Sequence, residues 1–125
     1  MRFQTGRPVS GACYLRRVKI SVVIPTLNEE GQIRGAVRSA RVADVEILVV
    51  DGGSEDGTRE TVKALGVRLL DSAPGRARQL AHGFEQASGD TCLFLHADTR
   101  LPAGWREAVC GALEDPRAAG GAFRF

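Results

Sequence analysis

The sequence alternates short apolar runs with segments of helical periodicity, and this alternation restricts the possible folds strongly. Apolar runs of strand length occur at residues 18–24, 46–50, 67–70 and 91–95. Between them lie segments of about ten residues or more whose apolar side chains recur at helical spacing. Runs that are apolar at successive positions are typical of parallel strands covered on both faces. The sequence therefore predicts an α/β fold with a doubly wound, mostly parallel, Rossmann-like sheet.

Helices are expected between and after these strands. Asn28 is a candidate N-cap for the first helix, and Thr58 to Leu65 form the second. Pro102 suits the opening turn of a helix that follows the strand at 91–95. Residues 121–125 resemble the start of a further strand. The apolar helix faces are expected to contain Ile33, Val37 and Ala40, then Ala77, Leu80, Phe84 and Ala87, and finally Trp105, Val109, Ala112 and Leu113.

The length of 125 residues suits one domain. Residues 1–17 show no periodicity, contain glycine and proline, and carry four arginines without an acidic residue, so we expect a flexible basic leader. Residues 18–125 are then the folded domain. Because the sequence stops on the apolar, strand-like segment Phe123 to Phe125, we expect this domain to be truncated at its C-terminus.

Composition excludes several classes of function. The net charge is only +2, and the positive excess falls in the first 17 residues, which argues against a nucleic-acid-binding surface. No apolar run reaches the roughly 18 residues needed to span a bilayer, so any membrane contact is expected at the surface. Three widely spaced cysteines without a CxxC motif indicate neither a disulfide framework nor a zinc site. A cytoplasmic protein, peripheral to the inner face of the membrane if it meets one, fits best.

Polar loops follow each apolar run, and the carboxyl ends of parallel strands meet at one edge of a sheet. The first loop offers Pro25, Thr26, Asn28 and Glu29, whose hydroxyl, amide and carboxylate groups suit a ribose or a base edge. It lacks the GxGxxG pattern of nicotinamide and flavin sites. The alternative is structural, with Asn28 as a helix cap and Glu29 complementing the helix dipole.

The second loop begins with Asp51, directly after a buried strand. A carboxylate there can accept a hydrogen bond from a pyrimidine imide, and Gly52 and Gly53 would let the backbone approach a flat ligand closely. An ATP-binding P-loop is excluded because its lysine is missing. The glycines alone are equally typical of a turn that binds nothing.

The third and fourth loops carry groups suited to a diphosphate and a metal ion. Arg76 and Arg78 lie near a helix start, where guanidinium groups and the helix dipole both favour phosphate. Alternate residues of a helix do not face one site, so we expect one of them to bind, with Arg76 preferred. Asp98 is a candidate ligand for Mg²⁺ or Mn²⁺, and His96 would suit Mn²⁺ better than Mg²⁺.

Four segments together resemble family 2 glycosyltransferases of the GT-A fold: SVVIPTLNEE, ILVVDGGSEDGT, GRARQLAHG and CLFLHADTRLP. The block FLHADTRLP is similar to that of the short bacterial members labelled radical-SAM/selenodomain-associated transferases. The resemblance covers residues 18–125 and implies transfer of a sugar, with inversion, from a UDP- or GDP-linked donor to an acceptor hydroxyl. It also implies a divalent metal, Mn²⁺ or Mg²⁺, that holds the diphosphate.

The resemblance assigns roles residue by residue. Thr26, Glu29 and Asp51 would hold the nucleoside, and Arg76 or Arg78 would lie near the base or diphosphate. In the family's Asp-x-Asp motif, His96 takes the first position and Asp98 the last, which removes one negative charge from the metal site.

The family's catalytic base belongs to an acceptor-binding half beyond residue 125, so no catalytic residue is assigned. A non-catalytic nucleotide-sugar-binding module is therefore the alternative. Both readings require Asp51 and Asp98 to face one hollow.

Overall fold

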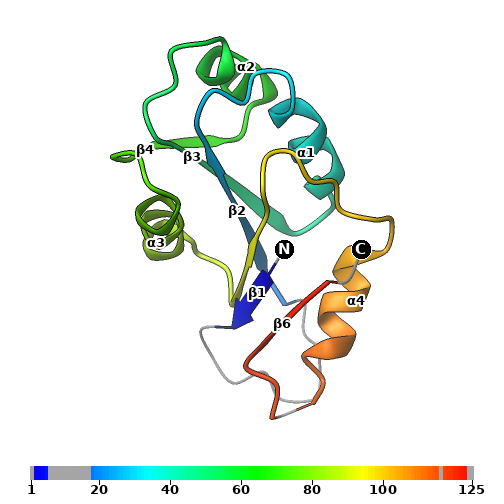
Figure 1. Ribbon diagram of the computed structural model, residues 1–125. Coiled ribbons are helices and arrows are strands. Elements are labelled where there is room, and N and C mark those ends of the chain that lie inside the picture. Colours follow the sequence, from blue (N-terminus) through cyan, green and yellow to red (C-terminus); the bar gives the residue numbers. More distant parts are fainter. Residues whose placement is uncertain (1, 6–17, 116, 124–125) are drawn as a thin grey trace.

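The computed structural model describes residues 2–5, 18–115 and 117–123, which form a six-stranded sheet with the order β4-β3-β2-β5-β1-β6 (Figure 1). The strands β2, β3, β4 and β5 pair in parallel, whereas β1 is antiparallel to both β5 and β6. This confirms the mostly parallel α/β sheet. The strand bounds are Arg2–Thr5 (β1), Ile20–Thr26 (β2), Val45–Asp51 (β3), Arg68–Asp71 (β4), Thr91–Phe94 (β5) and Gly120–Ala122 (β6).

Helices cover both faces of the sheet, as the doubly wound prediction requires. The helices α1 (Ile33–Ala40), α2 (Thr58–Leu65) and α4 (Trp105–Ala112) share the larger core. The helix α3 (Arg76–Gln86) packs alone on the other face, against Val23 (Figure 1). Burial of apolar side chains in both layers stabilises the sheet and fixes its carboxyl edge relative to the helix ends. The larger core includes Val22, Ile24, Ile33, Val37, Val49, Val62, Leu93, Trp105 and Val109.

The predicted apolar face of α3 is wrong in part. The buried residues of this helix are Gln79 and Gly83, whereas Phe84 is 41% exposed. A Cβ at Gly83 would lie 2.3 Å from Cγ1 of Val23, so only glycine permits this close approach of helix and strand. Because α3 contacts the sheet through Gly83, the helix is rotated so that the face with its larger apolar residues does not point fully at the sheet.

Asn28 does not cap the first helix. The helix α1 begins at Ile33, after a turn in which the amide of Ile33 donates to the Glu29 carbonyl at 2.9 Å, and its N-cap residue Gln32 makes no side-chain cap bond. Asn28 has a φ of 54°, in the left-handed region that asparagine tolerates better than most residues. Its amide is used elsewhere, as described below.

The leader prediction is wrong for residues 2–5, which form β1 within the sheet, while residues 6–17 lie outside the described ranges. The pairing supplies backbone partners to β5, and such pairing depends little on side-chain pattern. At the other end, β6 begins before the expected segment, and residues 124–125 are not described. Within the described part of the chain, no helix has the length and apolarity to cross a membrane.

Candidate functional site

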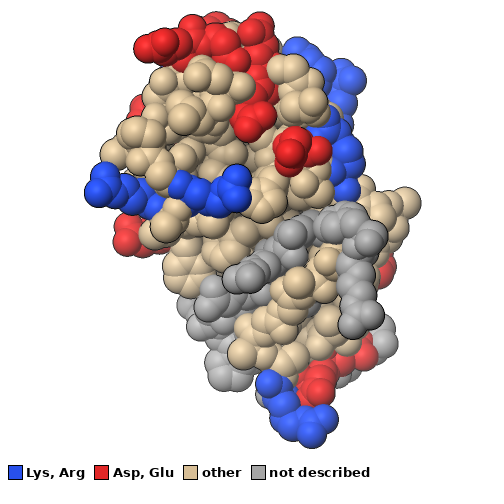
Figure 2. Space-filling model, in the orientation of Figure 1, with Lys and Arg blue, Asp and Glu red and all other residues tan. Residues whose placement is uncertain are grey.

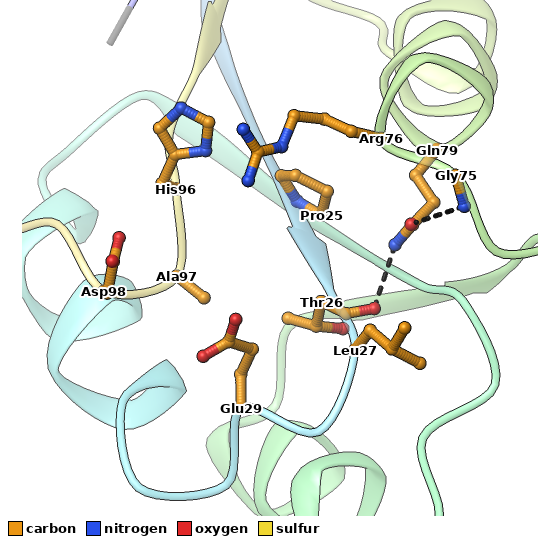
Figure 3. Close-up of a pocket in the computed structure, with 10 residues that line it drawn as sticks. All are labelled: Pro25, Thr26, Leu27, Glu29, Gly75, Arg76, Gln79, His96, Ala97 and Asp98. Atoms are coloured by element: carbon orange, nitrogen blue, oxygen red, sulfur yellow. Dashed lines mark hydrogen bonds between the residues drawn. The ribbon is translucent and has the colours of Figure 1, made fainter.

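A pocket of about 290 Å³ opens at the carboxyl edge of the sheet (Figure 3). The loop after β2, the start of α3 and the loop after β5 form its walls. This is the edge at which parallel α/β sheets bind ligands. The lining residues are Pro25, Thr26, Leu27, Glu29, Gly75, Arg76, Gln79, His96, Ala97 and Asp98.

The pocket brings together much of the predicted site, and Asn28, Asp51, Gly52, Gly53 and Arg78 are the predicted residues that do not line it. Of the two candidate arginines, Arg76 is the one in the pocket wall, as preferred from the sequence. The predicted residues that do line the pocket are Pro25, Thr26, Glu29, Arg76, His96 and Asp98.

The positive and negative side chains of the pocket wall lie on different sides of the hollow (Figure 3). Arg76 reaches from α3 toward His96, while the carboxylates of Glu29 and Asp98 lie across the hollow from the guanidinium group (Figure 3). Burial lowers the pKa of His96, and the positive charge of Arg76 lowers it further against the opposing effect of Asp98. At neutral pH the imidazole is therefore uncharged, with a nitrogen lone pair available to a cation.

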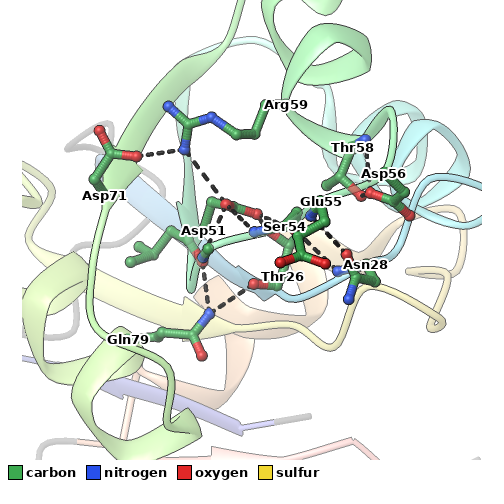
Figure 4. A network of polar contacts seen from close by, with 12 residues as sticks. Thr26, Asn28, Asp51, Ser54, Glu55, Asp56, Thr58, Arg59, Asp71 and Gln79 are labelled. Atoms are coloured by element: carbon green, nitrogen blue, oxygen red, sulfur yellow. Dashed lines mark hydrogen bonds and ion pairs between the residues drawn. The ribbon is translucent and has the colours of Figure 1, made fainter.

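Asp51 is not among the residues that line the pocket, but its carboxylate is hydrogen-bonded to Thr26, which does line it. Its side chain is fully buried and accepts hydrogen bonds from the Thr26 hydroxyl at 2.9 Å and the Ser54 amide at 2.8 Å (Figure 4). Arg59 also contacts it at 3.3 Å and bridges to Asp71. Both oxygens of the carboxylate therefore accept hydrogen bonds from within the protein. Asp51 thus supports Thr26, which does line the pocket.

Asp51 also makes stability depend on pH. Burial acts to raise the pKa of its carboxyl group, but hydrogen bonds from Ser54, Thr26 and Gly53 outweigh burial and hold the pKa below its ordinary value. A lowered folded-state pKa contributes stability above the unfolded value of about 4, and this contribution is lost as the pH falls through the folded-state pKa. We expect Asp51→Asn to be less stable than wild type at pH 7 and to lose less stability between pH 7 and 3, measured by urea unfolding. Equal losses on acidification would contradict this role.

Gly52 and Gly53 serve the loop rather than a flat ligand. A Cβ at Gly52 would lie 3.0 Å from Oε1 of Gln79, so the bare backbone makes room for that side chain. Gly53 has a φ of 104° and donates its amide to Asp51 at 3.1 Å. Contacts within the protein are therefore enough to explain why glycine stands at positions 52 and 53.

Sequence reasoning missed four residues of the pocket wall, Leu27, Gly75, Gln79 and Ala97, of which Gln79 makes the most polar contacts. It is 3% exposed, and its Nε2 donates to the carbonyls of Thr26 at 2.9 Å and Val50 at 2.8 Å. Its Oε1 accepts from the Gly75 amide at 3.3 Å (Figure 3). One amide thus joins the ends of β2 and β3 to the start of α3. The only sequence signal was a polar residue four positions before Gly83 on the same helix face.

The loop after β2 is interlocked with the loop after β3 through Asn28 and its neighbours. The Asn28 amide N–H donates to Ser54 Oγ at 2.9 Å, and Asn28 Oδ1 accepts from the Glu55 amide at 2.9 Å (Figure 4). The next two backbone N–H groups, of Glu29 and Glu30, donate to Thr58 and Asp56. Because these three backbone N–H groups, which precede α1, already donate hydrogen bonds within the protein, they are not available to a phosphate.

The donor set of the pocket fits a divalent cation that is shared with a bound diphosphate. Asp98 and His96 supply one carboxylate and one neutral imidazole from the same loop. Among the residues that the structure describes, no group of three or more acidic, histidine or cysteine side chains forms a ready-made metal site. Mg²⁺ is commonly held by one or two carboxylates with substrate phosphates and water, and an imidazole ligand favours Mn²⁺.

Similar proteins agree with this geometry. The chain is 33% identical over 98 residues to the undecaprenyl-phosphate 4-deoxy-4-formamido-L-arabinose transferase of Aeromonas hydrophila, covering 66% of this chain and 30% of that protein. The chain thus spans about a third of the length of such relatives.

Two solved structures are also similar. Glucosyl-3-phosphoglycerate synthase of Mycobacterium tuberculosis matches with a TM-score of 0.69 and 27% identity, covering 89% of this chain and 47% of that one. Its complex with Mn²⁺, UDP and glucosyl-3-phosphoglycerate matches with a TM-score of 0.59 and 31% identity, covering 64% and 33% of the two chains. These neighbours confirm the expected GT-A fold.

The sequence pattern described as "Glycosyl transferase family 2" matches residues 21–125. That range contains all the residues that line the pocket. The chain therefore belongs to glycosyltransferase family 2.

Proposed function

We propose that this chain binds a UDP- or GDP-linked sugar and transfers the sugar, with inversion, to an acceptor hydroxyl. The observation that carries the proposal is the pocket in which Thr26 and Glu29 face Arg76, His96 and Asp98 at the carboxyl edge of the sheet. Support comes from the related synthase whose structure contains Mn²⁺ and UDP. A nucleotide diphosphate matches a pocket with polar groups for a nucleoside beside cationic and metal-binding groups.

The donor is proposed to lie with its nucleoside against the β2 loop and its diphosphate between Arg76 and Asp98. Leu27 is 45% exposed in the pocket wall and supplies apolar surface for a base, and Glu29 can accept hydrogen bonds from ribose hydroxyls. The backbone amides of residues 28–30 are already bonded within the protein, so the anionic end is better placed at the α3 side.

The described residues serve the leaving group. As the anomeric C–O bond breaks, negative charge grows on the diphosphate, and the Arg76 guanidinium can stabilise that charge. A divalent cation held by Asp98 and His96 would, when bound, neutralise the same charge. Inversion also requires a base that takes the proton of the attacking hydroxyl on the opposite side of the sugar.

We propose that the acceptor is presented at a membrane and that the protein works on its cytoplasmic side. The name of the Aeromonas hydrophila relative includes undecaprenyl phosphate, whose long hydrocarbon chain requires a bilayer. The free thiols Cys92 and Cys110 agree with a reducing compartment.

The second candidate function is a nucleotide-sugar-binding module without transfer activity. Both candidates predict binding of the donor, but only the enzyme releases UDP or GDP from it. Product release measured with and without Mn²⁺ separates the two.

Calorimetric titration of UDP and GDP with and without Mn²⁺ tests the proposed site. The expected result is binding of one nucleotide more tightly than the other, strengthened by Mn²⁺ because cation and diphosphate share the site. Absence of binding by the folded protein to both nucleotides, with Mn²⁺ present, would remove the basis of the proposal.

Arg76→Gln is expected to weaken binding of UDP or GDP by roughly 10- to 100-fold, because a charged hydrogen bond to phosphate contributes about 1.5 to 3 kcal/mol. Binding of the uncharged nucleoside is expected to change little. Arg78→Gln is the matched comparison, since Arg78 is exposed on the same helix but does not line the pocket. Equal losses in the two variants would contradict the assignment to Arg76. The measurement is calorimetry at fixed ionic strength.

A further inference from the structure

The outer face of α1 carries a row of arginines that the proposed chemistry does not use. Arg34 and Arg38 are exposed and lie four residues apart on one side of the helix, and exposed Arg41 follows directly after its last residue. Exposed Arg100 lies across the same helix, since a Cβ at Gly35 would meet its Nε at 2.3 Å. Figure 2 shows basic side chains gathered along the edge that α1 forms in Figure 1. We call these four residues the arginine ridge.

The hydrogen bonds given for the ridge go to neutral oxygens. Arg100 donates to the carbonyls of Ala97 and Thr99 and to the side-chain amide oxygen of Gln32, at 3.1, 3.1 and 3.0 Å. Arg41 donates to the Leu65 carbonyl. Neutral acceptors orient a guanidinium group without cancelling its charge. The ridge therefore differs from Arg59, Arg68 and Arg117, each of which pairs with a carboxylate.

The ridge begins beside the pocket. Arg100 follows the pocket residue Asp98 by two positions, and its bond to Gln32 joins the β5 loop to the start of α1. Acidic side chains gather over the neighbouring loop and the start of α2, among them Glu55, Asp56 and Glu60 (Figure 2). The acidic side of this face thus lies over α2, while basic side chains gather along the α1 edge and also on the α3 side (Figure 2).

We propose that the arginine ridge docks the protein on an anionic bilayer, with lipid phosphates as its ligands. This inference rests on the proposed function, because a membrane-presented acceptor must reach the pocket beside the ridge. Guanidinium groups bind phosphate in two-point geometry, and clustered arginines are attracted to anionic membrane surfaces. Val42, 41% exposed just after Arg41, can enter the interfacial region. The acidic side would face away from the lipid.

Vesicle sedimentation at low salt tests the ridge, with the full chain and vesicles of phosphatidylglycerol and phosphatidylcholine. Arg34→Gln/Arg38→Gln is expected to lower the partition coefficient roughly 30-fold, which corresponds to about 1 kcal/mol for each arginine near an anionic surface. The control Lys19→Gln/Arg117→Gln removes the same charge from exposed positions outside the ridge and is expected to change partition less than threefold. Vesicles of pure phosphatidylcholine are expected to bind neither variant nor wild type.

Three outcomes would overturn the docking surface: absence of vesicle binding by wild type, equal partition of wild type and Arg34→Gln/Arg38→Gln, or equal losses in the ridge variant and the control. Binding of duplex DNA without binding of vesicles would also overturn it, by showing a different polyanion as partner. Calorimetry with UDP and Mn²⁺ on the same variants keeps the two proposals separate. Loss of vesicle binding with intact nucleotide binding supports the ridge, and absence of both UDP and GDP binding in wild type contradicts the proposed function alone.

Discussion

Asp98→Asn is expected to remove most of the Mn²⁺-dependent gain in UDP or GDP affinity, about 100-fold at saturating Mn²⁺. Asp98 is the exposed carboxylate on the β5 loop that lines the pocket, and His96 beside it carries no negative charge at neutral pH. Loss of a residue that only hydrogen-bonds to a metal ligand already costs about 10- to 100-fold, so loss of a carboxylate that itself contacts the metal is expected to reach the upper end. The affinity without Mn²⁺ is expected to change little.

The matched control for this prediction is Glu107→Gln, which removes an exposed carboxylate from α4 outside the pocket. It should keep the full effect of Mn²⁺. If Asp98→Asn kept a wild-type response to Mn²⁺ in calorimetry, the metal would have to be held by other groups. If both variants lost it equally, the effect would be one of overall charge.

Gln79→Leu is expected to lower the free energy of unfolding by about 2 to 3 kcal/mol and to weaken UDP or GDP binding as well. The substitution removes two hydrogen bonds to backbone carbonyls and one from the Gly75 amide, each contributing about 1 kcal/mol. The branched side chain must also fit where the Gln79 amide lies 3.0 Å from a Cβ built at Gly52. Urea unfolding measures this loss as a lower midpoint, with an unchanged dependence of the free energy of unfolding on urea concentration.

Gln86→Leu is the control, because Gln86 is exposed at the far end of α3 and accepts one bond from Arg68. Its expected cost is below about 1 kcal/mol. A cost for Gln79→Leu as small as that of the control would show that the buried amide does not hold α3 to the strand ends. Unchanged nucleotide affinity in a folded Gln79→Leu protein would show that the hydrogen bonds of Gln79 are not needed to position the start of α3 for binding.

The sequence predicted the sheet and most of the pocket because both depend on simple patterns. Four apolar runs could only be parallel strands covered on both faces, and the polar residues after them then had to meet at one edge. Thr26, Arg76 and Asp98 were placed in one pocket by this reasoning. Helix geometry allows only one of Arg76 and Arg78 to face the site, and Arg76 is preferred because it lies nearest the crevice.

The errors concern contacts between residues far apart in the chain. For Asp51, the sequence does not show that a hydroxyl 25 residues earlier and an amide of its own loop donate to the carboxylate. Asn28 was assigned to a helix cap or to a ligand, yet its amide holds the β3 loop, 27 residues away. Gln79 looked like one polar residue among several on α3. A local pattern does not show which distant backbone groups such side chains satisfy.

The central claim is that a nucleotide diphosphate and a divalent cation share the pocket between Arg76 and Asp98. Paramagnetic broadening of amide NMR signals by trace Mn²⁺ in the presence of UDP or GDP tests it most directly. Broadening centred on residues 96–98 and on Arg76, and greater with nucleotide than with Mn²⁺ alone, is the expected result. Broadening centred on Glu55, Asp56 and Glu60, and indifferent to nucleotide, would contradict the claim.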